Sequence, residues 1–440
     1  MQARFTPTAV WSYLRATYWF VPSLMTLGAL GLAFGLMAAD QRWGRDVLPG
    51  WIVGAGSDGA REVLSAVAGS MITVVSVTFS VTIVALTVSA QHFGPRLLNN
   101  FMRDRSTQVV LGIFISTFAY CLLVLRNVQG EGDQYDQFIP HLAVTAAVLL
   151  SLISVGALIY YIHHIAVALQ VSQIAKDVTR DLEQAIDRLY PEHLGRGEGS
   201  EEHIPAPPSA GVPVPFTSSG YIQQVEPGRV LELAQEKDVV VWLLVRPGDF
   251  ATEGLPMAIV SPRPADVEAF TDALNGALVL GADRTEYQDP EFPVQQLVEV
   301  TLHALSTGIN EPFTASTCID RLGQAFARLA TRRIPSPLRG DRNGVVRVIA
   351  SRKSFADLLD SACNPIRAHA ADSPGVLKQL LEVLVRLAQV AKRSEDQAAV
   401  ARQAGLILAT AERWRQDAAF DRHVQETYGR LQEALSRDPL

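Results

Sequence analysis

One apolar stretch, residues 63–90 (VLSAVAGSMITVVSVTFSVTIVALTVSA), constrains the fold of this chain more than any other segment. It contains no charged side chain, yet glycine, serine and threonine recur along it. A helix of this length is about 42 Å long, whereas the hydrocarbon core of a bilayer is about 30 Å thick. The stretch therefore predicts a membrane-spanning helix that tilts or extends beyond the bilayer.

The small and hydroxyl-bearing residues of this helix fall on two faces, given a rotation of about 100° per residue. One face carries Gly69, Thr73, Ser76, Ser80 and Thr87, and the roughly opposite face carries Thr78, Thr82 and Ser89. A lipid-facing helix has no use for two polar faces, so we expect this helix to lie in the interior. Two roles stay open for it. In the first, the helix lines a pore with the hydroxyls of Thr73, Ser76, Ser80 and Thr87. In the second, its small residues only let neighbouring helices approach closely.

Three further apolar runs, residues 20–39, 108–125 and 142–162, predict three more spans. Tryptophan and tyrosine precede the first run, which is typical of an interfacial belt on a retained span and not of a cleaved signal peptide. None of the four runs contains Asp, Glu, Lys or Arg. This pattern disfavours a proton relay but allows a passive pore. The first 170 residues are thus predicted to form a four-helix transmembrane domain, 1–170.

The basic residues near the spans indicate the orientation of the chain. With the N-terminus inside, the inner side carries Arg4, Arg15, Arg96, Arg103, Arg105, Lys176 and Arg180, and the outer side carries Arg42, Arg45, Arg61 and Arg126. The bias predicts an inner (plasma) membrane protein with both termini in the cytoplasm. His92 and Arg96 lie at the predicted inner mouth of the second span. They either attract anions there or serve as ordinary interfacial anchors.

The rest of the chain is predicted to form a cytoplasmic α+β domain, a small β-module followed by a helical bundle. Residues 171–190 carry an apolar stripe at helical spacing and predict a helical stalk that continues the fourth span. Residues 191–219 are rich in Gly, Pro, Ser and Glu and predict a flexible linker. Short apolar and alternating runs predict a small β-rich module over residues 220–292. Leucine-rich amphipathic runs predict a mainly helical domain over residues 293–440.

A group of charged and amide residues lies around two helices predicted within residues 294–330. Its members are Arg284, Asp289, Asn310, Glu311 and Thr314. A helix–loop–helix corner accounts for many of these residue types, because Gly and Asn end helices and proline begins them. The same side chains also offer a ligand or interface site. Both interpretations stay open.

Four segments carry a resemblance to a known family: VTFSVTIVALTVSAQHFGPRLLNNF, RPGDFATEG, RTEYQDPEF and ALSTGINEPFTASTCIDRL. Together they resemble a family of bacterial predicted membrane proteins known as a domain of unknown function, family 2254. The resemblance extends over nearly the whole chain. It implies a bacterial inner-membrane protein with a cytoplasmic domain and brings no activity to carry over. The family favours Ser-Pro-Gly and Asn-Asp-Pro where this chain has residues 306–308 (STG) and 310–312 (NEP).

The sequence contains no nucleotide-binding loop, G-x-S-x-G, HExxH or Cys/His metal spacing, so we expect no enzyme, no metal and no cofactor. The net charge of −7 disfavours nucleic acid as a partner. The favoured hypothesis is an oligomeric ion channel in the lipid bilayer, with its pore lined by the second span and gated by the cytoplasmic domain. The alternative is a non-conducting sensor or scaffold whose cytoplasmic domain binds a small-molecule ligand or a partner protein.

Overall fold

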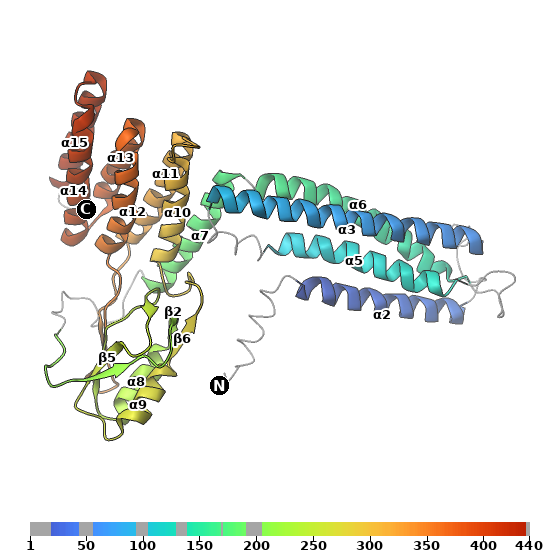
Figure 1. Ribbon diagram of the computed structural model, residues 1–440, viewed down its shortest axis with the longest axis horizontal. Coiled ribbons are helices and arrows are strands. Elements are labelled where there is room, and N and C mark those ends of the chain that lie inside the picture. The colour runs from blue at the N-terminus through green and yellow to red at the C-terminus, as the bar shows by residue number, and fades with distance from the viewer. Residues whose placement is uncertain are drawn as a thin grey trace. The chain divides into compact units, whose positions relative to one another are not determined.

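The computed structural model describes residues 19–43, 56–93, 104–128, 139–168, 170–190 and 205–436. The chain divides into two compact units, Met1–Gln170 and Val171–Leu440. The N-terminal unit consists of long helices, and the C-terminal unit combines two small sheets with shorter helices (Figure 1). The predicted fold class, a helical membrane part followed by an α+β part, is confirmed.

Four long helices form the described part of the N-terminal unit: α2 (Phe20–Trp43), α3 (Ser57–Phe93), α5 (Arg105–Arg126) and α6 (His141–Ala168). All four are long and apolar enough to cross a membrane. Each coincides with one of the predicted spans. The helix α3 begins six residues before the predicted span, because the polar segment from Ser57 to Glu62 continues the helix beyond the apolar run. With 37 residues, α3 is about 55 Å long.

The helix α5, and not α3, lies at the centre of the N-terminal unit. It contacts α2, α3 and α6. Within its most apolar window 56% of the residues are buried, against 17–22% in the other three helices. Small residues on α5 allow this close approach: a Cβ at Gly112 would collide with Met25 Sδ and lie 3.3 Å from Pro22 Cα. The expectation of an interior second span therefore holds for only one face of α3.

The C-terminal unit contains eight strands in its described part. They are β1 (Val212–Pro215), β2 (Gly220–Val225), β3 (Val240–Leu243), β4 (Phe250–Ala251), β5 (Pro256–Ser261), β6 (Leu278–Gly281), β7 (Leu338–Gly340) and β8 (Val346–Ala350). The larger sheet has the order β1-β5-β3-β8-β7, and the smaller has the order β4-β2-β6. Neighbouring strands are antiparallel, except that β3 and β8 are parallel.

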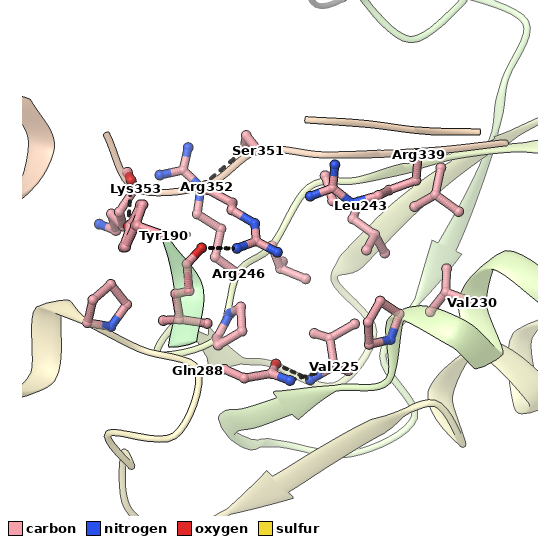
Figure 2. Close-up of a pocket in the computed structure, with 17 residues that line it drawn as sticks. Tyr190, Val225, Val230, Leu243, Arg246, Gln288, Arg339, Ser351, Arg352 and Lys353 are labelled. Atoms are coloured by element: carbon pink, nitrogen blue, oxygen red, sulfur yellow. Dashed lines mark hydrogen bonds between the residues drawn. The ribbon is translucent and has the colours of Figure 1, made fainter. Parts of the chain in front are cut away.

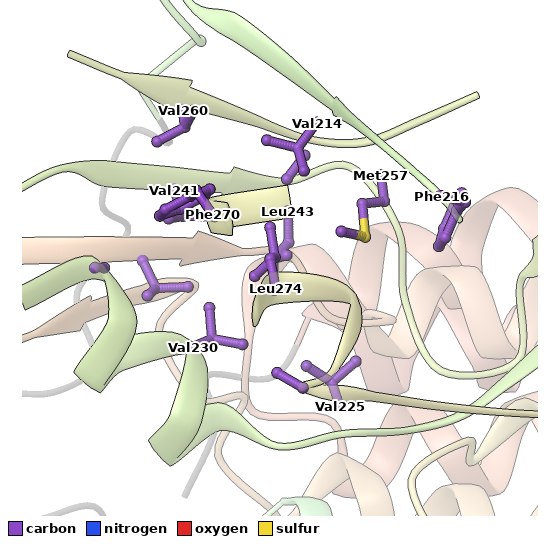
Figure 3. Close-up of a cluster of buried hydrophobic side chains, with 14 of the residues drawn as sticks. Val214, Phe216, Val225, Val230, Val241, Leu243, Met257, Val260, Phe270 and Leu274 are labelled. Atoms are coloured by element: carbon purple, nitrogen blue, oxygen red, sulfur yellow. The ribbon is translucent and has the colours of Figure 1, made fainter. Parts of the chain in front are cut away.

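Two short helices, α8 (Pro227–Glu236) and α9 (Val267–Asn275), cover the sheets and enclose one apolar core. Figure 3 shows this core, with Phe270 and Leu274 of α9 pointing toward Val241 and Leu243 of β3. The core extends beyond the predicted module of residues 220–292. The strand β1 comes from the predicted linker and β8 from the predicted helical domain, and both place apolar side chains in this core; β7, also from the helical domain, pairs with β8 at the edge of the larger sheet.

The remaining helices form a two-layered stack. They are α7 (Val171–Leu189), α10 (Glu291–Ala304), α11 (Pro312–Ala330), α12 (Phe355–His369), α13 (Pro374–Val390), α14 (Ser394–Ala411) and α15 (Ala418–Ser436). One layer runs α7, α11, α13, α15, and the other runs α10, α12, α14, with each helix contacting the next in its layer (Figure 1). Stacked helix pairs of this kind bury their apolar faces only against their neighbours.

The helix α7 belongs to this stack, and residue 169, between it and α6, lies outside the described residues. The helix α6 ends at Ala168, and α7 begins at Val171. Four residues of its predicted apolar stripe, Ile174, Val178, Leu182 and Ile186, are buried, and α7 contacts α10 and α11. The amphipathic pattern was therefore predicted correctly, but its apolar face is covered by the unit's own helices.

Candidate functional site

The four candidate pore-lining residues lie on the face of α3 that the described residues leave uncovered. Their hydroxyls each donate to a backbone carbonyl one turn earlier. The pairs are Thr73 to Gly69 (3.2 Å), Ser76 to Ile72 (2.9 Å), Ser80 to Ser76 (2.9 Å) and Thr87 to Ile83 (2.9 Å). The single donor of each hydroxyl is thus used inside the helix, and its remaining lone pairs face outward.

The opposite polar face of α3 packs inside the unit. Thr78 and Thr82 are buried, at 1% and 9% exposure. Tyr161 of α6 donates to the carbonyl of Thr78 at 2.9 Å, and its hydroxyl lies 2.7 Å from Thr82 Oγ1. One polar face is therefore explained by packing, whereas the other is not. The side chain of His92 and the whole of Arg96 fall outside the described residues.

A second polar group joins the start of α5 to the end of α6. Asp104 caps α5 by accepting from the backbone N–H groups of Ser106 and Thr107. Its Oδ2 also lies 2.7 Å from His164 Nε2, and His164 stacks on Tyr160. Sequence analysis did not select Asp104. An Asp a few residues before an apolar run is a helix-start signal that could have identified it.

The predicted polar group of the C-terminal unit is divided by α10 into two parts. Arg284 and Asp289 lie before its first turn, and Asn310, Glu311 and Thr314 lie beyond its last. A helix of 14 residues is about 21 Å long, so the structure does not bring the five together.

The part at the start of α10 is a buried network. Arg284 donates to Asp289 and Gln295 at 2.7 Å each and to Glu291 at 3.2 Å. Lys353 also contacts Glu291 at 3.2 Å. Asp289 is only 1% exposed, and this burial raises the pKa of its carboxyl although Arg284 opposes the rise. Such a network fixes the loop before α10.

The part beyond α10 is an exposed corner whose polar groups form hydrogen bonds within the corner itself. Asn310 adopts a positive φ of 50° and donates its N–H to the carbonyl of Ser306 at 2.9 Å. Glu311 donates its N–H to the carbonyl of Ala304 at 2.7 Å and accepts from the Thr314 hydroxyl at 3.0 Å. These bonds account for the residue types at the corner without a ligand.

A cavity of about 150 Å³ adjoins the buried network (Figure 2). Its apolar wall comes from the ends of three strands, from α8 and from the segment after β3: Val225, Val230, Leu243, Val245, Val348 and Ala350. Four basic side chains also line it: Arg246, Arg339, Arg352 and Lys353. The sequence could not show this group, because its members are up to 107 positions apart and meet only through the pairing of β3 with β8.

The basic residues of the cavity differ in their partners. Lys353 contacts Glu291, and Arg246 lies 4.0 Å from Asp357. Arg352 instead donates to the carbonyl of Leu189 at 2.8 Å. Among the described residues it has no carboxylate partner. Burial lowers the pKa of Arg352, and the neighbouring charge of Arg339 lowers it further.

Four candidate spans followed by a unit of two small sheets and a helical stack define a multi-span membrane protein with a large second unit. The chain belongs to the family described as "Predicted membrane protein (DUF2254)", whose model matches residues 15–386. It is 33% identical over 410 residues to uncharacterized proteins of Mycobacterium bovis and Mycobacterium tuberculosis, which is 92% of this chain and 78% of each relative. No solved structure matches it. The resemblance inferred from the four segments is thus confirmed.

Proposed function

We propose that this protein is an oligomeric ion conductance whose pore is lined by the uncovered face of α3. The supporting observation is that Thr73, Ser76, Ser80 and Thr87 are exposed while Thr78 and Thr82 on the opposite face are buried. Their donors are bonded within the helix, so the face presents acceptor oxygens. Around a central axis, such oxygens favour water and cations.

The proposal includes an inner-membrane location with the C-terminal unit in the cytoplasm, where it gates the pore. The excess of basic residues beside the predicted inner ends of the spans supports this orientation. The partners are then the lipid bilayer, further copies of the chain and the conducted ions. In the described part of a single copy, α5 lies at the centre, so the proposed pore lies between several copies.

Planar bilayers with the purified full-length protein test the conductance. We expect Ser80→Leu and Thr87→Leu to lower the current by about tenfold or more, because leucine replaces acceptor oxygens with an apolar constriction. The control is Val81→Leu, an exposed position about 100° around the helix from Ser80. A silent wild-type protein, a current unaffected by Ser80→Leu, or a monomer in mild detergent would each contradict the proposal.

A second candidate function is a non-conducting membrane sensor or scaffold. The basic cavity of the C-terminal unit favours it, since a pocket with an apolar wall and a few convergent polar groups is the usual form of a small-molecule site. Ligand binding by a protein that carries no current would distinguish this candidate from the conductance.

A further inference from the structure

We propose that the cavity beside β3 and β8 binds a small organic phosphate, with its phosphate on Arg339 and Arg352 and its apolar body against the strand ends. This inference stands on the C-terminal unit alone and does not require the conductance. It gives the ligand class that the sensor candidate lacks. The residues involved are those of Figure 2.

The charges around the cavity favour an anion with more than one negative charge. Four cationic side chains line it; Glu291 contacts Lys353 at 3.2 Å, and Asp357 lies 4.0 Å from Arg246. Arg352 is left with a backbone carbonyl as its partner. A guanidinium matches two oxygens of a phosphate at once, so a phosphate ester satisfies it better than a single carbonyl does.

The positive charge at the cavity contrasts with the net negative charge of the whole chain. Its 45 acidic residues outnumber its 38 basic ones. A cluster of arginines in an acidic protein costs free energy through mutual repulsion unless an anion offsets it. The cluster is also fixed in place: Arg339 bonds the carbonyls of Ser336 and Leu338, and Arg246 bonds Ser351 Oγ at 3.0 Å. A binding site formed in advance loses little entropy on binding.

The apolar wall sets the size of the rest of the ligand. A closed cavity of about 150 Å³ holds a benzene-sized group in known proteins, and the volume here is about the same. Val225 and Val230 point into the cavity opposite the arginines in Figure 2. Inorganic phosphate would leave this wall unused, whereas an ester with a ring-sized apolar group covers it.

Binding of phenyl phosphate to the full-length protein in detergent, measured by titration calorimetry, tests the assignment. We expect saturable binding that is tighter than that of inorganic phosphate, and none with phenol. Arg352→Gln should weaken phenyl phosphate binding about tenfold or more, because charged hydrogen bonds to phosphate are lost. Ala350→Leu fills the cavity and should reduce phenyl phosphate to the affinity of inorganic phosphate.

The matched control is Arg422→Gln, which removes the same charge from an exposed position on α15. It should leave phenyl phosphate binding unchanged. The assignment is overturned if the wild-type protein shows no saturable binding up to about 10 mM, or if Arg352→Gln and Arg422→Gln have the same effect. Equal affinity for phenyl phosphate and inorganic phosphate overturns the inference that an apolar group of the ligand binds against the strand ends. Because no current is measured, failure of the conductance does not affect these results.

Discussion

At the scale of single residues, Asp187 shows how α7 is fixed to the helical stack. Its carboxylate accepts from Arg328 Nε and Nη2 at 2.7 Å each and from Arg332 Nη2 at 2.6 Å. Both arginines belong to or directly follow α11. The hydrogen bond from Arg328, with smaller contributions from Arg332, lowers the pKa of Asp187 below its ordinary value of 3.8. The folded state is therefore stabilised by the ionised form.

The ion pairs of Asp187 with Arg328 and Arg332 predict that the stability of the C-terminal unit depends on pH. A pKa that is lower in the folded than in the unfolded state stabilises the fold above the unfolded value and loses that effect as the pH falls. We expect Asp187→Asn to destabilise the C-terminal unit by about 1 kcal/mol at neutral pH, a value for a partly exposed network. Melting temperatures of the wild-type protein and of Asp187→Asn, measured at several pH values, check this. A difference that persisted unchanged below the ordinary pKa of 3.8 would contradict it.

Sequence analysis identified some members of the polar sites and missed their partners. It selected Arg284 and Asp289, which are bonded to each other, because they lie five positions apart. It missed Lys353, which joins the same network from 69 positions away. It grouped Asn310 with them, since residue types predicted a helix between Asp289 and Asn310 but did not show how that helix separates them in space. Local polar spacing was thus informative, and long-range pairing was not.

At the scale of helices, Gly323 determines how closely α11 approaches α13. A Cβ at this position would lie 2.8 Å from Val383 Cγ1 and 3.3 Å from Cγ2, both on α13. Val383 is itself buried, at 6% exposure, so it has little room to move. The glycine therefore contributes to packing, although glycine inside a helix is intrinsically unfavourable.

Substitution at Gly323 is predicted to separate the two helices. We expect Gly323→Leu to lower the free energy of unfolding by about 1–3 kcal/mol through overpacking. The matched control is Gly405→Ala on α14, where no atom lies within 4 Å of the added Cβ. That change should stabilise by about 0.5–1 kcal/mol, because alanine is a better helix former. Denaturant unfolding measures both; a neutral Gly323→Leu would show that Val383 moves aside.

Element by element, periodicity predicted helices better than it predicted their neighbours. The four spans and the leucine face of α13 follow directly from apolar spacing. The strand β8 lies in a region predicted to be mainly helical, and its place beside β3 depends on a parallel pairing across more than 100 residues. Likewise, the pattern of α3 gave two polar faces but could not show that α5 takes the central position. These features depend on packing between distant segments, which residue spacing does not encode.

At the scale of the whole molecule, the chain divides into two compact units. The core of the sheets contains only residues after position 210, and the buried clusters of the spans contain only residues before 170. We therefore expect the fragment Val171–Leu440 to be soluble without detergent and to unfold cooperatively. Size-exclusion chromatography and thermal melting check this. Aggregation that only detergent reverses would show that the unit needs the spans to fold.

Within the described residues, α14 and α15 form the outer end of the two-layered stack, and no further helix pair packs on them. Each pair packs on the one before it, and no described residue of α14 or α15 lines the cavity beside the sheets. The length of the stack is therefore free to vary independently of the chemistry at its base. Adding or removing an outer helix pair would therefore leave the residues that line the cavity unchanged.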